Sequence, residues 1–272
     1  MGAAGQNPRR VHGMVDVDSQ DRPQDWVRLL DVLDAEPFYA AYKARSRELL
    51  APAAPGRYLD VGGGTGANAA RLADEYGIDV VVVDHAHTMA RAARSRGLAQ
   101  VSVADAARLP FAAGTFAGAM ADRVLQHLDE PASAVAEMVR VTVPGGRVVL
   151  ADPDYDTQVL DIDDQDIARA VLRFRADHLL RNGTLAHRHA GMLATSGLTD
   201  IVVETRTLVV RDPNAVDHVL GLRSWAGAAA KRGLLEPARA AAFEAAVDRA
   251  IRAGRFLYAV TFFLTVGVKP VA

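Results

Sequence analysis

The sequence predicts an α/β protein built on a doubly wound, mostly parallel sheet, with helices added at the N-terminus and after the fifth strand. Three observations predict this fold class. Short apolar runs alternate with helix-like segments between residues 58 and 150, which is typical of strands buried on both faces. Four glycines within five residues follow the first run, where a strand turns into a helix. Carboxylates follow four of the runs, at the edge where parallel strands end beside a ligand.

The N-terminal part is expected to be helical after a loose start. Residues 1–22 are polar and rich in small side chains, so we expect a flexible tail. In residues 25–50 apolar side chains recur at helical spacing, and Pro37 should divide this segment into two helices. We therefore expect helices over residues 23–52, followed by a loop.

Strands and helices then alternate, and their crossovers should be right-handed. The tripeptide Pro144-Gly145-Gly146 predicts a turn into the fifth strand. The expected strands cover residues 58–60, 79–84, 100–103, 116–120, 147–150, 201–210 and 256–268, and the expected helices cover 67–73, 131–141, 164–181, 187–195, 212–231 and 237–253.

The regular alternation weakens after the fifth strand. We expect cap insertions at about 155–196 and 212–253, attached to a main domain of residues 53–272. Apolar side chains of the caps are candidates for an apolar pocket, although the same residue types also make ordinary core. These candidates are Leu179, Leu180, Met192, Leu193, Leu220, Leu222 and Trp225.

The composition argues against several classes of protein. The chain has 272 residues, of which 24% are charged, with a net charge of −2 and no block of like charges, so no basic face is expected for nucleic acid or an anionic membrane. Residues 1–20 lack the apolar core of a signal peptide, and the most apolar run, 258–268, is shorter than the roughly 20 residues that span a bilayer. We expect a cytoplasmic protein that acts on a small molecule, and a homodimer stays open.

Metal chemistry is not expected. The chain has no cysteine, which excludes a disulfide framework, a Cys–zinc site and a thiol nucleophile. His187 and His189 are two residues apart and would point to opposite sides of a helix. The acidic run 161–166 lacks the spacing of an EF-hand.

The segment 58–66 predicts a ligand cradle. Its apolar strand ends in Asp60, and the glycines that follow let the backbone turn with positive φ and let a ligand approach closely. Free N–H groups at the start of the next helix favour a carboxylate or a phosphate. The spacing Asp60-x-Gly62-x-Gly64-x-Gly66 is similar to motif I of the class I S-adenosylmethionine (SAM) methyltransferases, and the same glycines also fit a dinucleotide fingerprint.

Acidic residues mark the ends of four successive strands. Asp60, Asp84, Asp105 and Asp122 each stand at or just past the end of an apolar run. One such residue alone would be an ordinary helix cap. Four in succession indicate a ligand site along the carboxyl edge of the sheet.

The order and spacing of these features resemble the class I SAM methyltransferases over residues 58–154. The resemblance implies a Rossmann-like, seven-stranded sheet with an antiparallel last strand, SAM as cofactor and S-adenosylhomocysteine as product. It implies that Asp84 accepts hydrogen bonds from the ribose, that residues 85–89 pass over the adenine, and that residues 23–52 cover the cofactor. The cofactor-binding residues that it implies are Asp60, Gly62, Gly64, Asp84, His85, Met89, Asp105, Ala106, Asp122 and Arg123. Tyr42, with Tyr39 as the alternative, is the candidate on the N-terminal helices to close over the SAM.

Residues 122–128, Asp-Arg-Val-Leu-Gln-His-Leu, are similar to the motif after strand four in ubiquinone/menaquinone-type methyltransferases and their antibiotic-pathway relatives. Gly63 stands where many of these enzymes have Cys; both residues are small, so cofactor binding is not affected. The resemblance fades over residues 154–253 and does not transfer a substrate.

Methyl transfer from SAM requires a nucleophile aligned with an electrophilic methyl group in a site without water. His127 is the first candidate for a base, because the ordinary pKa of histidine, about 6.5, suits proton removal near neutral pH. A hydrogen-bonding strut is an equal interpretation of His127. Asp152, Asp154 and Tyr155 follow the fifth strand and are the other candidates, although Asp154 equally suits a turn cap.

The sequence therefore predicts SAM-dependent methyl transfer to a small, apolar metabolite in a specialised biosynthetic pathway. A second interpretation keeps SAM and assigns a non-methylating cyclisation to the pocket, because the cofactor motif would be the same. A third, a NAD(P)-dependent oxidoreductase, is disfavoured because the Tyr-x-x-x-Lys spacing of Tyr39 and Lys43 precedes the cofactor strand.

Overall fold

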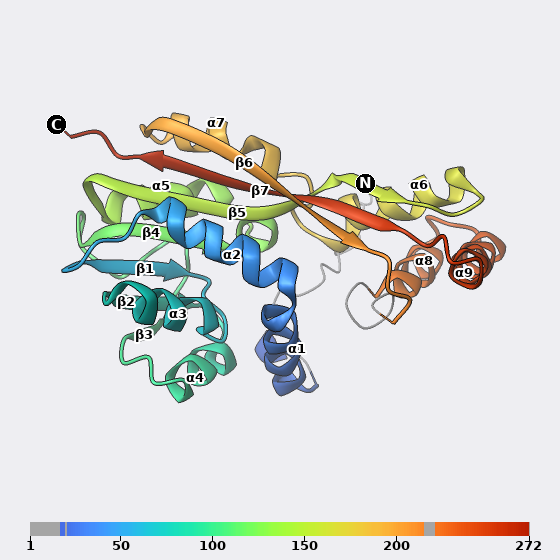
Figure 1. Ribbon diagram of the computed structural model, residues 1–272, viewed down its shortest axis with the longest axis horizontal. Coiled ribbons are helices and arrows are strands. Elements are labelled where there is room, and N and C mark those ends of the chain that lie inside the picture. Colours follow the sequence, from blue (N-terminus) through green and yellow to red (C-terminus); the bar gives the residue numbers. More distant parts are fainter. Residues whose placement is uncertain (1–16, 20, 215–220, 272) are drawn as a thin grey trace, which may run out of the picture.

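The computed structural model describes residues 17–19, 21–214 and 221–271, and a seven-stranded sheet forms its centre (Figure 1). The strand order is β3-β2-β1-β4-β5-β7-β6. β1 to β5 pair in parallel, whereas β7 is antiparallel to both β5 and β6. The predicted fold class is confirmed, including the antiparallel last strand. The strands are β1 Arg57–Val61, β2 Asp79–Asp84, β3 Val101–Val103, β4 Phe116–Asp122, β5 Thr142–Leu160, β6 Thr199–Val210 and β7 Tyr258–Val268.

Helices cover both faces of the sheet because successive strand residues point to opposite sides. Val80 and Val82 belong to a hydrophobic core with α2 and α3, whereas Val81 and Val83 belong to a second core with α5 and α7. The helices are α1 Pro23–Ala35, α2 Pro37–Leu50, α3 Ala67–Tyr76, α4 His87–Ser95, α5 Pro131–Val141, α6 Gln165–Phe174, α7 His189–Thr195, α8 Leu222–Lys231 and α9 Pro237–Arg252. None of the described helices is long and apolar enough to cross a bilayer.

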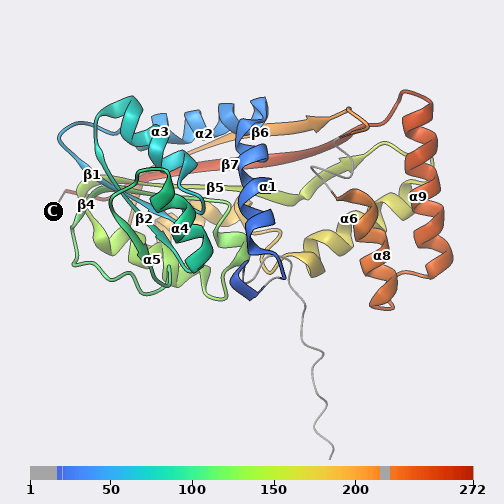
Figure 2. The ribbon, with the colours of Figure 1, turned by 90° about the horizontal axis from the view of Figure 1, so that it is seen from below.

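Two long strands carry the cap away from the cofactor half of the sheet. β5 pairs with β7 from Arg147 to Asp154 and, after a register shift, again at Val159 and Leu160. The strands β5, β6 and β7 run past the shorter parallel strands toward α6, α8 and α9 (Figures 1 and 2). α6, α8 and α9 therefore lie together at one end of the molecule, whereas α7, which belongs to the first predicted insertion, packs beside α5.

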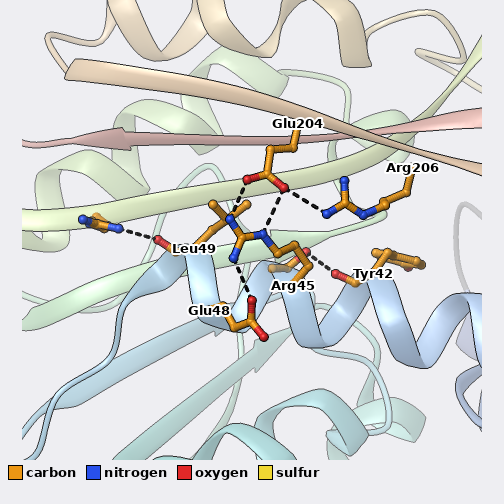
Figure 3. Close-up of polar contacts among 8 residues, drawn as sticks. Tyr42, Arg45, Glu48, Leu49, Glu204 and Arg206 are labelled. Atoms are coloured by element: carbon orange, nitrogen blue, oxygen red, sulfur yellow. Dashed lines mark hydrogen bonds and ion pairs between the residues drawn. The ribbon is translucent and has the colours of Figure 1, made fainter.

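The N-terminal helices lie as the sequence predicts, and the break between them has a local cause. Glu36 adopts an extended backbone, with φ −66° and ψ 136°, because the ring of Pro37 disfavours a helical conformation in the preceding residue. On α2, Arg45 donates two hydrogen bonds to Glu204 of β6, at 3.0 and 2.6 Å, and a third to Glu48 (Figure 3). This cluster joins α2 to the edge strand of the sheet.

The described part of the predicted tail packs against the start of α4. Val17–Ser19 forms a short 3-10 turn in which Val17 is buried. The carboxylate of Asp18 accepts hydrogen bonds from the backbone N–H groups of His87 and Thr88, at 2.6 and 2.9 Å. Asp18 thus satisfies two free donors at the start of α4 from a distant part of the chain. Residues 1–16 of the predicted tail lie outside the described residues.

Several elements differ from the sequence-based expectation, among them α4, for which no helix is expected, and β5, which is expected to end at residue 150. Pro144-Gly145-Gly146 is a bulge inside β5 rather than a turn before it, because the pairing of β4 with β5 shifts register there. The helix expected over residues 164–181 ends at Phe174 and continues as a π-helix, Arg175–Leu179. The helix expected from residue 212 begins only at Leu222, and residues 215–220 of that range lie outside the described part.

Candidate active site

A cavity of about 540 Å³ lies where the carboxyl ends of β1, β2 and β4 meet α1 and the inner side of the cap. This volume is within the range of roughly 300–1,000 Å³ that is usual for small-molecule sites. One end of the cavity is lined by the glycine turn after β1 and by the acid at the end of β2. The other end is lined by the end of β5, the π-helix and α8. Both ends open into one continuous space.

The glycine turn has the shape of a cradle. Gly62 and Gly64 have φ values of +65° and +55°, which side chains with a Cβ rarely adopt. A Cβ at Gly62 would lie 2.5 Å from a methyl of Val124, so the turn packs tightly below the cavity. A Cβ at Gly64 would meet only Leu30, at 3.8 Å. The turn is therefore open on its cavity side, as an extended ligand lying on the backbone requires.

The carboxylate of Asp84 is hydrogen-bonded to this turn and can accept further hydrogen bonds from a ligand. Its carboxylate accepts hydrogen bonds from the backbone N–H groups of Gly64 and Ala86, both at 2.9 Å. Burial raises the pKa of Asp84, and these two N–H groups together with His85 oppose the rise. A carboxylate has about four lone-pair positions, so two further donors can be accepted on the cavity side. The hydroxyls of a ribose supply two such donors, and the residues present therefore fit the sugar of SAM.

His85 and Met89, the two other predicted residues at this end, also line the cavity. Asp105 and Ala106 do not. Asp105 is exposed beyond β3, where its carboxylate accepts from the backbone N–H of Ala107 at 2.9 Å. Their contact with the adenine stays a prediction that rests on the resemblance.

Charged groups of α1, α2 and β4 form a chain along the floor of the cavity. Lys43 lies 2.6 Å from Asp34 and 3.0 Å from Asp122, so it bridges two carboxylates. Lys43 and Asp34 are not among the residues that the sequence predicts for the site. The one available signal is the four-residue spacing of Tyr39 and Lys43, which places Lys43 on the inward side of its helix.

Tyr42 lies outside the cavity lining. It is buried in an aromatic cluster of α2 and β7. Its hydroxyl donates to Asp122 at 2.8 Å. Tyr42 therefore contacts Asp122 from below the cavity, because its face of α2 packs on the sheet, and its contact with the cofactor stays a prediction.

Asp60 is a buried carboxylate in the cavity wall. One of its oxygens, Oδ2, has no hydrogen-bond partner in the described part of the chain. Burial, reinforced by the nearby charge of Asp122, raises the pKa of Asp60 to about 7. A cationic ligand group beside Asp60 would supply the missing partner, and the ammonium group of SAM is such a group.

Arg123 follows β4 with φ +56°, an uncommon backbone conformation for a residue with a side chain. Its guanidinium lies over the ring of Tyr39, with the central carbon 5.2 Å from the ring centre. Burial opposes its charge, but Tyr42, Tyr39 and Asp122 raise the pKa of Arg123, so it stays protonated.

His127 lines the cavity, but its basicity differs from the expectation. Burial, together with the positive charge of Arg123, lowers the pKa of His127 to about 4. Its Nδ1 atom has no hydrogen-bond partner among the residues described. The ring is therefore neutral at physiological pH and is a weaker base than an ordinary histidine. Its Nε2 lies 3.1 Å from the amide nitrogen of Gln126 and accepts from it, so Nδ1 carries the ring proton.

The remaining candidates lie on β5, and their side chains point to different faces of the sheet. Tyr155 lines the cavity, whereas the side chains of Asp152 and Asp154 belong to the opposite face, because side chains alternate along a strand. Asp154 is buried and accepts from the backbone N–H of His187 at 3.0 Å, and the ring Nδ1 of His187 lies 2.6 Å from the same oxygen. Asp154 thus lies outside the cavity lining and joins β5 to the segment before α7, and its contact with a substrate stays a prediction.

Asp152 lies on the same face of β5 as Asp154 and is also absent from the cavity lining. It faces His189 with 3.5 Å between Oδ2 and Nε2, and both side chains are fully buried. Burial raises the pKa of Asp152 and lowers that of His189 to about 4, so both groups are uncharged.

The cap end of the cavity is mostly apolar, with one basic residue. Leu179, Leu180 and Trp225 line it, as the sequence suggests, and Leu222 is core instead. Arg175, which the sequence does not single out, lines the cavity from the first position of the π-helix. Met192 and Leu193 are absent from the lining, and Leu220 lies outside the described residues.

In comparisons with known proteins, part of the chain matches a family model, and most of the chain is similar to a bacterial protein. Residues 59–150 match the family model described as a methyltransferase domain. A 37.1 kDa protein of a Streptomyces fradiae transposon, described as uncharacterized, is 34% identical over 249 residues, which cover 89% of this chain and 71% of that protein.

Further likenesses cover the cofactor half or the fold. Demethylmenaquinone methyltransferase of Renibacterium salmoninarum is 40% identical over 107 residues, which are 39% of this chain and 45% of that enzyme. The structure of phosphoethanolamine N-methyltransferase 2 of Haemonchus contortus superposes with a TM-score of 0.60 and 18% identity, over 96% of this chain and 61% of that one. The matched segment contains both the glycine turn and Asp84, and we conclude that the protein belongs to the class I SAM-dependent methyltransferases.

Proposed function

We propose that the protein transfers the methyl group of SAM to a small, largely apolar acceptor in a specialised biosynthetic pathway. The observation that carries this proposal is that one continuous cavity joins the glycine cradle to an apolar chamber of the cap. A donor on the cradle and an acceptor in the chamber would lie side by side without a barrier of protein. Such proximity is the main requirement of methyl transfer.

The binding of the cofactor would be divided among separate residues. Asp84 would accept from the ribose hydroxyls, and Gly62 and Gly64 would let the methionine part lie on the backbone. Asp60 would face the ammonium group. When bound, SAM supplies a sulfonium-activated methyl group.

The other residues of the cavity would orient the acceptor and keep water out. Leu29 and Leu30 of α1 and Trp225 of α8 close the cavity with apolar surface. The Nε2 atom of His127 would accept a hydrogen bond from an acceptor hydroxyl in place of the amide of Gln126, and would take up the proton of the hydroxyl late in the transfer. Tyr155 offers a second polar group at the same wall.

Mass spectrometry of reaction mixtures tests the proposal. Purified protein is incubated with SAM and candidate metabolites, and products are compared with reactions that lack SAM. We expect a product heavier than its substrate by one methyl group and an equal amount of S-adenosylhomocysteine. A rearranged product of unchanged mass, formed without consumption of SAM, would instead support cyclisation. Calorimetric binding of NAD without binding of SAM would contradict both interpretations.

A further inference from the structure

The cap end of the cavity contains a cation whose hydrogen-bonding capacity is not used. Arg175 lies with its guanidinium carbon 3.8 Å from the ring centre of Trp225 and 4.4 Å from that of Tyr155. The two aromatic rings hold the planar group in place and keep its apolar surroundings intact. One of its terminal nitrogens, Nη1, is buried and has no hydrogen-bond partner in the described chain.

No acid of the described residues forms an ion pair with Arg175. The neighbouring acids are engaged elsewhere: Asp177 and Asp156 lie 2.7 and 3.6 Å from Arg173, and Asp166 lies 3.2 Å from Arg169. Arg173 and Arg169 are exposed on the outer side of the cap, whereas Arg175 lines the cavity. A buried donor without a partner costs free energy, so its retention here indicates a ligand acceptor.

The charges of the cavity are distributed unequally between its two ends. The lining carboxylates Asp34, Asp60, Asp84 and Asp122 all belong to the cofactor end. Lys43 is neutralised there by two of them. At the cap end, the described lining consists of apolar and uncharged polar groups around Arg175. The cofactor end has a second cation, Arg123, and therefore mixes both signs of charge, whereas an anionic group of a substrate at the cap end would meet Arg175 without a competing acid.

We propose that Arg175 binds a carboxylate of the methyl acceptor, so that the substrates of this enzyme are apolar molecules that carry one acidic group. The inference rests on the proposed function, because it assigns the acceptor to the cap end of the same cavity. A guanidinium matches a planar carboxylate with paired hydrogen bonds. A single arginine between apolar walls suits a monoanion better than a phosphate dianion, which needs more than one cation. Leu179 and Leu180 would contact the apolar body of the substrate.

Three matched probes test the preference for a carboxylate without any assay of turnover. Binding of 3-phenylpropionate, of its neutral isostere 3-phenylpropionamide and of 2-phenylethyl phosphate is measured by ligand-observed NMR, with S-adenosylhomocysteine present. We expect the carboxylate to bind about 10- to 100-fold more tightly than the amide, the effect of a charge-assisted hydrogen bond. The phosphate should bind more weakly than the carboxylate. Equal affinities for the carboxylate and the amide, or strongest binding by the phosphate, would overturn the proposal.

Three variants assign the preference to one side chain. Arg175→Gln should abolish the preference and leave amide binding within about twofold, whereas Arg169→Gln, an exposed arginine of the same cap, should change nothing. Arg175→Lys keeps the charge and should retain part of the preference. Equal weakening of the carboxylate and the amide by Arg175→Gln would show a packing role and contradict the inference. If Arg175→Gln fails to fold, the comparison of probes on the unaltered protein decides alone.

Binding of S-adenosylhomocysteine to the unaltered protein is measured first. Its absence would refute the proposed function, and the carboxylate preference would then be measured on the free protein. Its presence, combined with no preference for the carboxylate, would refute only the inference about Arg175.

Discussion

The buried carboxyl group of Asp60 makes the stability of the fold depend on pH. In the unfolded chain an aspartate loses its proton near pH 3.9, whereas Asp60 in the fold keeps its proton to about pH 7. Between these values the folded state binds more protons than the unfolded state, so the free energy of unfolding falls as pH rises from about 4 to 7.

We predict that in Asp60→Asn the free energy of unfolding no longer falls for this reason as the pH rises from about 4 to 7. At pH 8 the variant should be more stable than the unaltered protein by on the order of 1–3 kcal/mol, whereas at pH 4 the two should differ little. Urea unfolding at both pH values measures the difference. Asp74→Asn, at an exposed position of α3, serves as the control. An identical pH dependence in the unaltered protein and Asp60→Asn would show that Asp60 is charged in the fold.

Asp84 should dominate the affinity for the cofactor. We expect Asp84→Ala to weaken binding of S-adenosylhomocysteine by roughly 2–3 kcal/mol, because two charge-assisted hydrogen bonds to the ribose are lost. Isothermal calorimetry measures the affinity, and circular dichroism checks that the fold survives. Asp74→Ala is the control and should bind normally. Unchanged affinity in Asp84→Ala would place Asp84 outside the cofactor site.

His127 should contribute to turnover and not to cofactor binding. Because its pKa is near 4, it is a weak base, and we expect His127→Ala to lower kcat by about 100-fold, the lower end of the usual range for a general base. The rate should fall on acidification only near pH 4, since protonation removes the base. His127→Gln keeps a hydrogen-bond acceptor and separates positioning from proton transfer. A fully active His127→Ala variant would leave Tyr155 as the next candidate.

At the scale of elements, the turn between β1 and α3 depends on one steric contact. Gly62 lies in this turn, and Gly77 directly follows α3. Their φ values are +65° and +63°, so a Cβ strains the backbone equally at both positions. At Gly62 the Cβ would also lie 2.5 Å from Val124, whereas at Gly77 it would meet nothing within 4 Å. The turn is therefore locked by packing in addition to backbone conformation.

The pair Gly62→Ala and Gly77→Ala separates these two costs. Gly77→Ala should destabilise the protein by about 1 kcal/mol, the usual cost of a left-handed residue with a side chain. Gly62→Ala should cost about 1–3 kcal/mol more, because the added methyl overpacks the turn. Chemical denaturation of both variants measures the difference. Equal losses would show that Val124 moves aside at no cost.

At the scale of the whole molecule, the cavity connects segments that are distant in the chain, from α1 to α8. A ligand that contacts them all should stabilise the fold as one unit. At a concentration about 100 times its Kd, S-adenosylhomocysteine should stabilise the native state by about 2.7 kcal/mol. We therefore expect the melting temperature to rise by several degrees in a thermal unfolding scan. The same scan with NAD should show no rise, and Asp84→Ala should show a reduced rise with S-adenosylhomocysteine.

Local patterns determined the sheet and the cofactor end of the site. The apolar runs and glycines specify the strands and turns from β1 to β4 within a few residues, so the positions of Gly62, Gly64 and Asp84 follow from the sequence. Side-chain direction on β5 was also accessible in principle. Tyr155 and Asp154 are neighbours on an extended strand, so only one of them can face the cavity.

Tertiary structure decided the groups whose neighbours come from elsewhere in the chain. The bridging position of Lys43 depends on how α2 packs against the end of β4, and the pKa of His127 depends on burial beside Arg123. Arg175 becomes a candidate binding residue only because β5 and β7 extend past the parallel strands, so that the π-helix lines the same cavity as their carboxyl ends. The sequence by itself determined the family and the cofactor cradle, because these rest on short-range patterns. The acceptor chamber depends on long-range packing, which no local pattern encodes.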